Sequence, residues 1–426
     1  MYKRQTIYDV LHLGHARTFT AFDAAIRYLK SQNLNVKFVR NITDIDDKII
    51  NRAKELNIHP MELTQKYEKL MFEDFESLNL LKPNVEPKVS EHIEEIIEMI
   101  LVLVDKRFAY QSSNGDVLFD ISKFEEYGKL SGQKTENNSS SFNERELIQK
   151  RIKENDADFV LWKSSEDENS TFESPFGRGR PGWHIECSAM AKKHLGSNFD
   201  IHGGGLDLTF PHHENEIAQS TCANDSSYAN IWMHTGMITV DGVKMSKSLG
   251  NFITIKDVLS EYDAESVRLF LLSSHYRSNM DFTKASITQA DKNLKKVYRA
   301  LKSSGLSYSE KHVDNETIEK FHNAMRDDFN TPLALSYIYE EASHLNKSED
   351  KLKIAHFSNI VEMSSTLGLW TKDPSLFNEN KGMDYDPEID ELIRKREEAR
   401  SNKDYAESDR IRDILRNKGY QVNDKK

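Results

Sequence analysis

Residues 6–48, TIYDVLHLGHARTFTAFDAAIRYLKSQNLNVKFVRNITDIDDK, decide the fold of this chain. They begin with the strand-like run Thr6–Val10. Apolar residues at helical spacing then predict an amphipathic helix from about Thr18 to Ser31, and Asn35–Arg40 predicts a second strand. Strand, helix and strand within roughly 30 residues make a βαβ unit, which implies a parallel sheet whose ligands bind at the carboxyl ends of the strands.

The pattern beyond this unit is that of a doubly wound domain with an insertion. Helical periodicity dominates Ile49–Arg107, and weak strand signals and a polar tract then occupy about Ala109 to Asp156. Strand-like Phe199–His202 and Asn230–His234 alternate with helices, and after about Met280 the chain is almost wholly helical. We therefore expect an α/β fold with a Rossmann-like, doubly wound parallel sheet, followed by an all-α bundle.

Composition and charge limit the class of protein. With 426 residues, 38% of them apolar and 30% charged, the chain is long enough for several globular domains of roughly 100–200 residues each. No apolar run approaches the ~18 residues of a membrane-spanning helix, and Met1–Gln5 is not followed by an apolar leader. Cys187 and Cys222 make no disulfide framework, which favours a reducing cytoplasm. The net charge of −11 argues against indiscriminate nucleic-acid binding.

A short motif, His12-Leu13-Gly14-His15, lies between the first strand and the first helix. Gly14 allows a flat ligand to approach the backbone closely, and the helix that follows offers its amino-terminal N–H groups to a phosphate. The alternative, and the commoner one for such a motif alone, is an ordinary turn with two surface histidines.

A second motif, Lys244-Met245-Ser246-Lys247-Ser248, lies past the middle of the chain in a segment broken by Gly250. Its ammonium groups match the charge that develops when the α-phosphate of ATP is attacked, and Lys247 suits the departing pyrophosphate. A solvated basic turn is the alternative for this motif alone. Together with His12–His15 it predicts an ATP site without a glycine-rich phosphate loop.

Metal-ligating residue types gather in two blocks, Trp183–Cys187 and Pro211–Glu216. His212 and Glu216 are four residues apart, so on a helix they share one face. Cys187, His212 and Glu216 are competent Zn²⁺ ligands. A buried cysteine beside acids at a helix amino terminus is the alternative.

Two further polar segments follow predicted strands. Gly203–Gly205 clear space for a ligand, and Asp207 can accept a hydrogen bond from an amine or a ribose hydroxyl; a flexible loop is the alternative. The acids Asp44, Asp46 and Asp47 also fit a helix N-cap and its first turn.

Longer blocks carry a family resemblance. The paired motifs HLGH and KMSKS resemble the signature of class I aminoacyl-tRNA synthetases. NITDIDDKI at Asn41–Ile49, GRPGWHIECSAM at Gly179–Met190 and GGGLDLTFPHHENEIAQS at Gly203–Ser220 resemble the cysteinyl-tRNA synthetases in particular, and the resemblance covers nearly the whole chain. It implies an enzyme that joins cysteine to ATP as cysteinyl-adenylate, releases pyrophosphate and passes the cysteinyl group to the 3′-terminal ribose of tRNA(Cys).

The resemblance also implies roles for the motif residues. The residues that would bind ATP are His12, Gly14, His15 and Lys247. The catalytic residues would be His12, His15, Lys244 and Lys247. One zinc ion on Cys187, His212 and Glu216 would bind the thiolate of cysteine, with Trp183, Asp207 and His234 around the substrate, and Mg²⁺ would accompany ATP. Because a hydrophobic pocket rejects a near-isostere by only about 10–200-fold, a soft thiolate on zinc is the stronger means of excluding serine.

The implied domain division separates catalysis from RNA recognition. The expected parts are two catalytic halves at 1–108 and 157–279, a connective insertion at 109–156, a helical anticodon-binding bundle at 280–375 and a small helical RNA-contact region at 376–426. Basic residues between Arg394 and Lys418 fit a phosphate-contact surface, with a solvated helix as the alternative. We expect a cytoplasmic monomer with tRNA(Cys), cysteine and ATP as partners and no contact with a membrane.

The chain departs from the family pattern at its start. The family's first zinc cysteine falls at Lys3, and MYKRQ does not resemble the expected strand. We expect a chain truncated or misjoined at its amino terminus and slightly short at its carboxyl end, with the first strand missing and zinc held weakly by three ligands. Two other functions stay open: a cysteine ligase of low-molecular-weight thiol biosynthesis, which transfers cysteine to an amino sugar, and a catalytically impaired RNA-binding relative.

Overall fold

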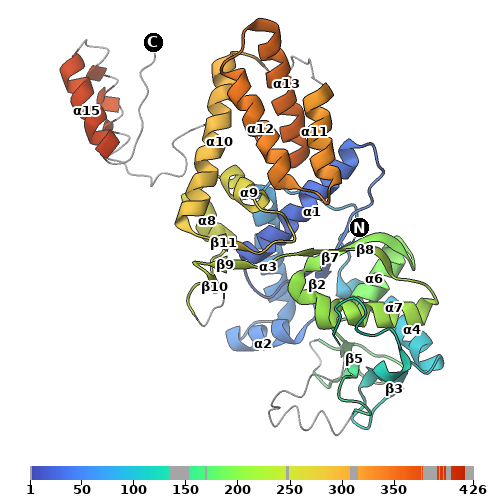
Figure 1. Ribbon diagram of the computed structural model, residues 1–426. Helices are drawn as coiled ribbons and strands as arrows, with labels where there is room; N and C mark the ends of the chain where they lie inside the picture. Colours follow the sequence, from blue (N-terminus) through green and yellow to red (C-terminus); the bar gives the residue numbers. More distant parts are fainter. Residues whose placement is uncertain are drawn as a thin grey trace.

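The computed structural model describes residues 2–133, 153–167, 170–245, 249–307, 315–375 and 377, and most of 391–417, without some side chains, among them those of residues 2–6. Figure 1 shows an α/β part beneath a bundle of long helices. No helix of the described ranges is both long and apolar enough to cross a membrane.

Four parallel strands form the central sheet. They are β1 (Tyr2–Thr6), β2 (Val39–Thr43), β7 (Phe199–Gly205) and β8 (Ala229–Thr235), in the order β2-β1-β7-β8. Helix α1 (Leu13–Ser31) connects β1 to β2 and completes the predicted βαβ unit. The chain builds the sheet outward in one direction from β1 and in the other from β7, so a ligand crevice is expected at the carboxyl ends of these two strands. The doubly wound parallel sheet is confirmed.

The first strand is Tyr2–Thr6 and not the predicted Thr6–Val10. Its pairing in the sheet decides this, because Tyr2 lies opposite Val39 and Thr6 lies opposite Thr43. After Thr6 the chain bends towards the HLGH motif. The prediction of a missing strand does not hold, since the residues of MYKRQ form most of β1.

The second strand is Val39–Thr43 and not the predicted Asn35–Arg40. The backbone N–H of Phe38 donates to Oδ1 of Asn84 at 2.8 Å, and the carbonyl oxygen of Phe38 accepts from the backbone N–H of Asn84 at 2.8 Å. Because these bonds occupy the backbone of Phe38, the chain joins the sheet only from Val39 onward.

The insertion has an antiparallel sheet of its own. Its strands are β3 (Ala109–Gln111), β4 (Val117–Phe119), β5 (Phe159–Ser164) and β6 (Gly179–Pro181), in that order. Phe159 pairs with Phe119 and Trp162 pairs with Pro181, so the strands that follow residue 157 belong to the same sheet as β3 and β4. The polar tract at 137–141 lies outside the described residues.

Within its described residues, the α/β part has five further helices and several short turns. The helices are α2 (Asp47–Leu56), α3 (Pro60–Ser77), α4 (Ile93–Asp105), α6 (Ile185–Leu195) and α7 (Glu214–Asn224). The short turns are 3-10 helices at Val89–Glu91, Ile121–Lys123 and Leu206–Leu208 and a π-helical turn at Thr209–His213. Helix α6 packs against α7, and this contact brings the two metal-ligating sequence blocks together.

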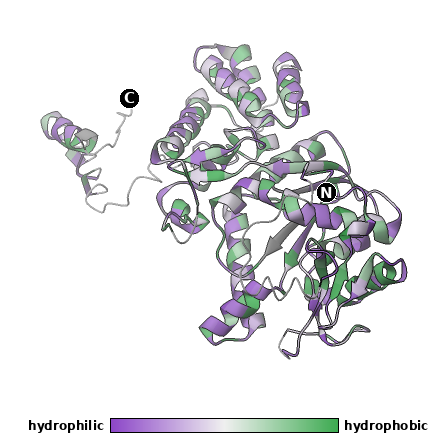
Figure 2. Cartoon of the chain, turned by 60° about the horizontal axis from the view of Figure 1, so that its bottom comes forward, coloured by the Kyte–Doolittle hydropathy of each residue, from purple (hydrophilic) through white to green (hydrophobic). Residues whose placement is uncertain are grey.

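A small sheet and two helices connect the catalytic part to the bundle. They are β9 (Ile238–Val240), β10 (Val243–Lys244), β11 (Met280–Phe282), α8 (Ile255–Glu261) and α9 (Ala264–Leu272). The bundle is α10 (Lys284–Ser304), α11 (Asn315–Arg326), α12 (Thr331–Leu345) and α13 (Asp350–Leu367), and α15 (Tyr405–Asn417) follows it. Hydrophobic and hydrophilic residues alternate along the bundle helices (Figure 2). One apolar core runs from α1 through α9 into α10–α13.

Candidate active site

A cavity of about 340 Å³ lies at the carboxyl ends of β7 and β8. Several predicted residues line it, namely His12, Gly14, His15, Trp183, Asp207 and Lys244. Tyr8, Thr18 and Lys48 line it as well, and the sequence did not assign them. For Lys48 a signal was present, because it follows the carboxyl end of a strand that a parallel sheet directs towards the ligand.

The two imidazoles of the HLGH motif close the first turn of α1 as a reciprocal cap. Nδ1 of His12 accepts from the backbone N–H of Gly14 at 3.0 Å, and Nδ1 of His15 accepts from the backbone N–H of His12 at 3.3 Å. The ring centroids lie 3.8 Å apart. Burial lowers the pKa of His12 to about 4, although the Asp207 carboxylate opposes this shift, so the imidazole is neutral at pH 7.

The chain that leaves the KMSKS motif is bonded to the HLGH turn. The backbone N–H of Leu13 donates to the carbonyl oxygen of Ile253 at 3.2 Å, and the N–H of Ile255 donates to the carbonyl oxygen of Leu11 at 3.1 Å. Lys244, at the end of β10, lines the cavity, whereas Lys247 lies outside the described residues. The HLGH turn and the described part of the second motif, Lys244 and Met245, therefore line the same cavity.

Cys187, His212 and Glu216 converge as predicted, and all three are buried. Sγ of Cys187 lies 3.7 Å from Nε2 of His212, which lies 2.7 Å from Oε1 of Glu216. Burial alone would raise the pKa of Glu216, but His202 and His212 beside it bring that pKa well below its ordinary range. Glu216 is therefore a carboxylate.

The three residues fit a zinc ion by donor chemistry and spacing. Thiolate, imidazole and carboxylate are its usual protein ligands. With zinc–sulfur and zinc–nitrogen bonds of about 2.3 and 2.1 Å, the sulfur–nitrogen edge of a tetrahedral site is about 3.6 Å. The 3.7 Å between Cys187 and His212 is close to this value.

A network of further histidines, which the sequence did not assign, surrounds the cluster. Nδ1 of His184 and Nδ1 of His212 share a hydrogen bond of 2.7 Å, and Nε2 of His202 lies 3.0 Å from Oε2 of Glu216. His202, His213 and Glu216 form a second group of metal-ligating types that uses the same carboxylate. The sequence could not have revealed this group from local spacing, because His202 lies in β7, away from His213 and Glu216.

The three predicted substrate residues differ in position. Trp183 and Asp207 line the cavity, and the Trp183 ring centroid lies 4.6 Å from that of His212. His234 is not among the lining residues; its Nε2 shares a hydrogen bond of 2.8 Å with Nδ1 of His213. Burial lowers the pKa of His234 to about 4. His234 is thus placed to orient His213.

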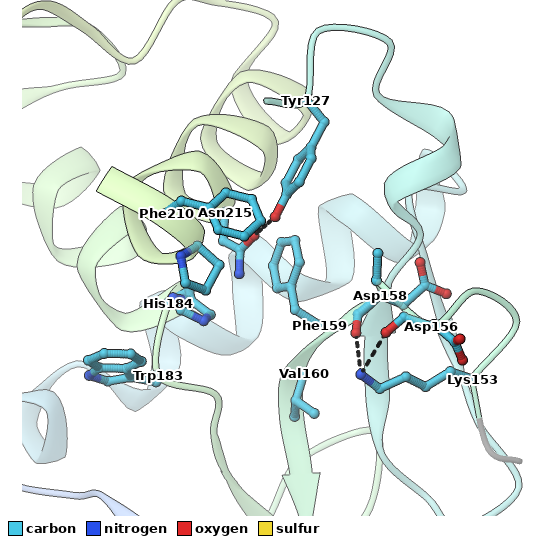
Figure 3. A pocket seen from close by; sticks show the side chains of 12 residues that line it. Tyr127, Lys153, Asp156, Asp158, Phe159, Val160, Trp183, His184, Phe210 and Asn215 are labelled. Atoms are coloured by element: carbon cyan, nitrogen blue, oxygen red, sulfur yellow. Dashed lines mark hydrogen bonds between the residues drawn. The ribbon is translucent and has the colours of Figure 1, made fainter. Parts of the chain in front are cut away.

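A second cavity, of about 400 Å³, lies on the insertion side of Trp183 (Figure 3). Tyr127, Phe159 and Phe210 give it aromatic walls. At its rim Nζ of Lys153 donates to the carbonyl oxygens of Asp156 and Asp158, at 3.5 and 2.6 Å. Trp183 lines both cavities and so forms the partition between them.

The basic residues near the carboxyl end are largely paired within their own helices. Arg394 pairs with Glu391 and Glu398, Arg410 with Glu407, and Arg412 with Asp409, whereas Arg396 is only 3% exposed. Arg400 and Lys418 lie outside the described residues. A phosphate-contact surface here stays a prediction, because a phosphate would have to displace these carboxylates.

Three family models match the sequence. They are the tRNA synthetases class I (C) catalytic domain at residues 2–292, the DALR domain at 320–371 and the cysteinyl-tRNA ligase anticodon binding domain at 383–426. Anticodon binding was predicted for the bundle at 280–375. The matching family model lies after this bundle, at 383–426.

Relatives and solved structures agree with these matches. The chain is 47% identical over 424 residues to the cysteine–tRNA ligase of Idiomarina loihiensis, covering 98% of this chain and 91% of the relative. It is 50% identical over 415 residues to that of Pseudoalteromonas translucida, covering 96% and 89%.

The fold is similar to methionyl-tRNA synthetase of Mycobacterium tuberculosis bound to methionyl-adenylate, with a TM-score of 0.61, 17% identity and coverage of 86% and 88%. LeuRS of Agrobacterium radiobacter K84 gives a TM-score of 0.61, 12% identity and coverage of 86% and 82%. The chain belongs to the cysteine–tRNA ligases, a family of class I aminoacyl-tRNA synthetases.

Proposed function

We propose that this chain activates cysteine with ATP in the cavity of about 340 Å³ and passes the cysteinyl group to the 3′-terminal ribose of tRNA(Cys). One observation carries the proposal: backbone hydrogen bonds hold the HLGH turn against the chain that leaves KMSKS, on a cavity whose Trp183 contacts the Cys187–His212–Glu216 cluster. ATP and cysteine sites thereby share one wall.

His12 and His15 are the residues proposed to hold the phosphates of ATP. Because Nδ1 of each ring accepts a backbone hydrogen bond, each ring carries its N–H group at Nε2. That N–H group can donate to a phosphate oxygen. The amino terminus of α1 adds its positive dipole end, and Gly14 leaves room for the ligand.

The first chemical step is attack of the cysteine carboxylate on the α-phosphorus of ATP. The bond from that phosphorus to the bridging oxygen breaks, and the negative charge leaves with pyrophosphate. Lys244 and Lys247 are proposed to neutralise this charge, which Mg²⁺ brought by ATP would share. In the second step a hydroxyl of the terminal ribose attacks the cysteinyl carbonyl and AMP leaves.

Cys187, His212 and Glu216 are the proposed ligands of one zinc ion, which would supply a soft Lewis acid for the thiolate of cysteine. Asp207 is proposed to accept a hydrogen bond from the substrate amine, and Trp183 to exclude water from one side. His234 acts on the site through its bond to His213.

We also propose that the chain works as a cytoplasmic monomer. Both cysteines are free and buried, which suits a reducing compartment. Light scattering of the purified chain at micromolar concentration tests the monomer.

The test of the activity is cysteine-dependent exchange between ATP and pyrophosphate, followed by charging of tRNA(Cys). Lys244→Ala is expected to reduce exchange by about 10²-fold. Lys347→Ala, which removes an exposed lysine of the bundle, is the matched control and is expected to leave exchange unchanged.

Two outcomes contradict the proposal. Exchange without tRNA charging, but with transfer of cysteine to an amino sugar, identifies a ligase of thiol biosynthesis. Absence of exchange at saturating zinc, cysteine and ATP identifies a catalytically impaired relative.

A further inference from the structure

A second group of metal-ligating side chains lies in the helical bundle, away from the active site. Glu341 and His344 of α12 and His356 of α13 each present one ligand atom, and these atoms lie within 4.8 Å of one another. We propose that this group binds one divalent transition-metal ion, with zinc as the best fit, which links α12 to α13. The proposal is independent of the function of the cavity.

The backbone sets up the group. Glu341 and His344 are three residues apart on α12, so they share one face of that helix. Helix α13 packs along α12 and presents His356 to the same place. Nδ1 of His356 lies 2.9 Å from Oε2 of Glu341, and the ring centroids of His344 and His356 lie 5.3 Å apart.

The side chains of Asn359 and Thr317 donate hydrogen bonds to the carboxylate of Glu341. Nδ2 of Asn359 donates to Oε2 of Glu341 at 3.0 Å, and Oγ1 of Thr317 donates to Oε1 at 3.3 Å. Glu341 itself is only 3% exposed. Such outer partners fix the orientation of a metal-ligating carboxylate.

A simple ion pair between His356 and Glu341 is the competing explanation, and it leaves His344 unexplained. The ring nitrogens of His344 make no hydrogen bond with any residue that the structure describes, yet the ring lies against that pair. His344 is also exposed, which gives an ion a path from solvent and leaves room for a water ligand.

The donor set selects the class of ion. Two imidazoles and one carboxylate suit zinc, cobalt or nickel, whereas calcium and magnesium prefer all-oxygen sites. No thiolate belongs to this group, in contrast to the group at Cys187. The two sites therefore differ in the spectrum of bound cobalt, because only Cys187 can give a sulfur-to-metal charge-transfer band.

The experiment uses the full chain, stripped of metal with a chelator and titrated with Zn²⁺ alone and with Co²⁺ alone. Wild-type protein is expected to bind one equivalent more than His344→Asn, and His356→Gln is expected to lose the same equivalent. His322→Asn, which removes a partly exposed histidine of neighbouring α11, is the matched control and should bind as wild type does.

Two further readouts separate this site from the one at Cys187. The equivalent lost in His344→Asn should leave the thiolate band of bound cobalt unchanged. Zinc should raise the Tm of wild type more than that of His344→Asn, since an ion that binds only the folded state stabilises it. The proposal is overturned if wild type and His344→Asn bind the same number of metal equivalents, whether or not metal binds at Cys187. It is also overturned if His322→Asn loses one equivalent as His344→Asn does.

Discussion

The backbone N–H of Leu13 donates a hydrogen bond of 3.2 Å to the carbonyl oxygen of Ile253. This bond joins the turn that carries His12 and His15 to the chain that leaves the KMSKS motif. With the bond from Ile255 to Leu11, it holds the chain at residues 253–255 against the first turn of α1. The geometry of the proposed ATP site therefore depends on both stretches of chain.

Gly14→Ala is expected to impair ATP binding without unfolding the protein. A Cβ at Gly14 would lie 2.8 Å from Cε1 of His12 and would push the imidazole out of its cap. Because alanine is the better helix former by about 0.5–1 kcal/mol, the Tm should not fall much. The KM for ATP in the exchange reaction should rise about tenfold or more, and a normal KM for ATP would contradict the role given to His12.

Acid is expected to destabilise the chain through its neutral histidines. Burial lowers the pKa of His12 and of His234 from 6.5 to about 4, so the unfolded chain takes up protons more readily than the folded one. The stability from these two neutral rings is complete above pH 6.5 and is lost as the pH falls towards 4.

Partial exposure of both rings reduces the effect, which should amount to about 1–3 kcal/mol between pH 7 and pH 4. Urea unfolding at a series of pH values measures it. The double variant His12→Gln/His234→Gln should show a shallower decline than wild type over this range. If the free energy of unfolding of the variant falls as steeply with pH as that of wild type, groups other than His12 and His234 cause the acid sensitivity.

Cys187→Ser is expected to lose one equivalent of zinc and to weaken cysteine binding more than ATP binding. Cys187 is the one thiol of the cluster with His212 and Glu216. Cys222→Ser is the matched control, because Cys222 is also buried, at 5% exposure, but lies in the apolar core beside α4, where burial raises its pKa to about 12.

Metal analysis and separate KM values for cysteine and ATP decide this prediction. Cys187→Ser should bind one equivalent of zinc fewer than wild type, and Cys222→Ser should bind as much zinc as wild type does. Equal zinc content in the two variants would show that Cys187 is not a zinc ligand.

Arg268→Met is expected to lower the free energy of unfolding by about 1–3 kcal/mol, because it takes from the buried carboxylate of Asp23 one of its two guanidinium partners and leaves only Arg27. The Arg268 guanidinium is fully buried, pairs with Asp23 of α1 and donates to the carbonyl oxygen of Leu367 at 2.8 Å. It thus ties the first helix of the catalytic part to the end of α13. Arg326→Met, which breaks an exposed pair with Glu319, should lower the free energy of unfolding far less in the same denaturation experiment.

The sequence predicted those features that depend on local spacing. The βαβ unit follows from apolar periodicity, and the pairing of His212 with Glu216 follows from their separation on one helix face. The position of β1 could not be predicted in this way, because it is set by pairing with Val39 across the sheet.

The same reason applies to the strand pairing of the insertion and to the unassigned histidines. Phe159 belongs to the insertion only because it meets Phe119 of another strand. His184 and His202 reach the cluster through residues of α7 and its preceding turn, so no run of sequence contains their partnership.

Trp183→Ala is expected to raise the KM for cysteine about tenfold while changing the KM for ATP much less. The ring separates the two cavities and packs at 4.6 Å from His212, so its loss admits water beside the proposed thiolate site. Trp183→Phe keeps an aromatic partition and should recover most of the affinity for cysteine. Exchange assays titrated separately in cysteine and ATP, on protein whose zinc content equals that of wild type, distinguish this loss from loss of the metal. Equal rises in both KM values would mean that Trp183 supports the whole cavity and not the cysteine side alone.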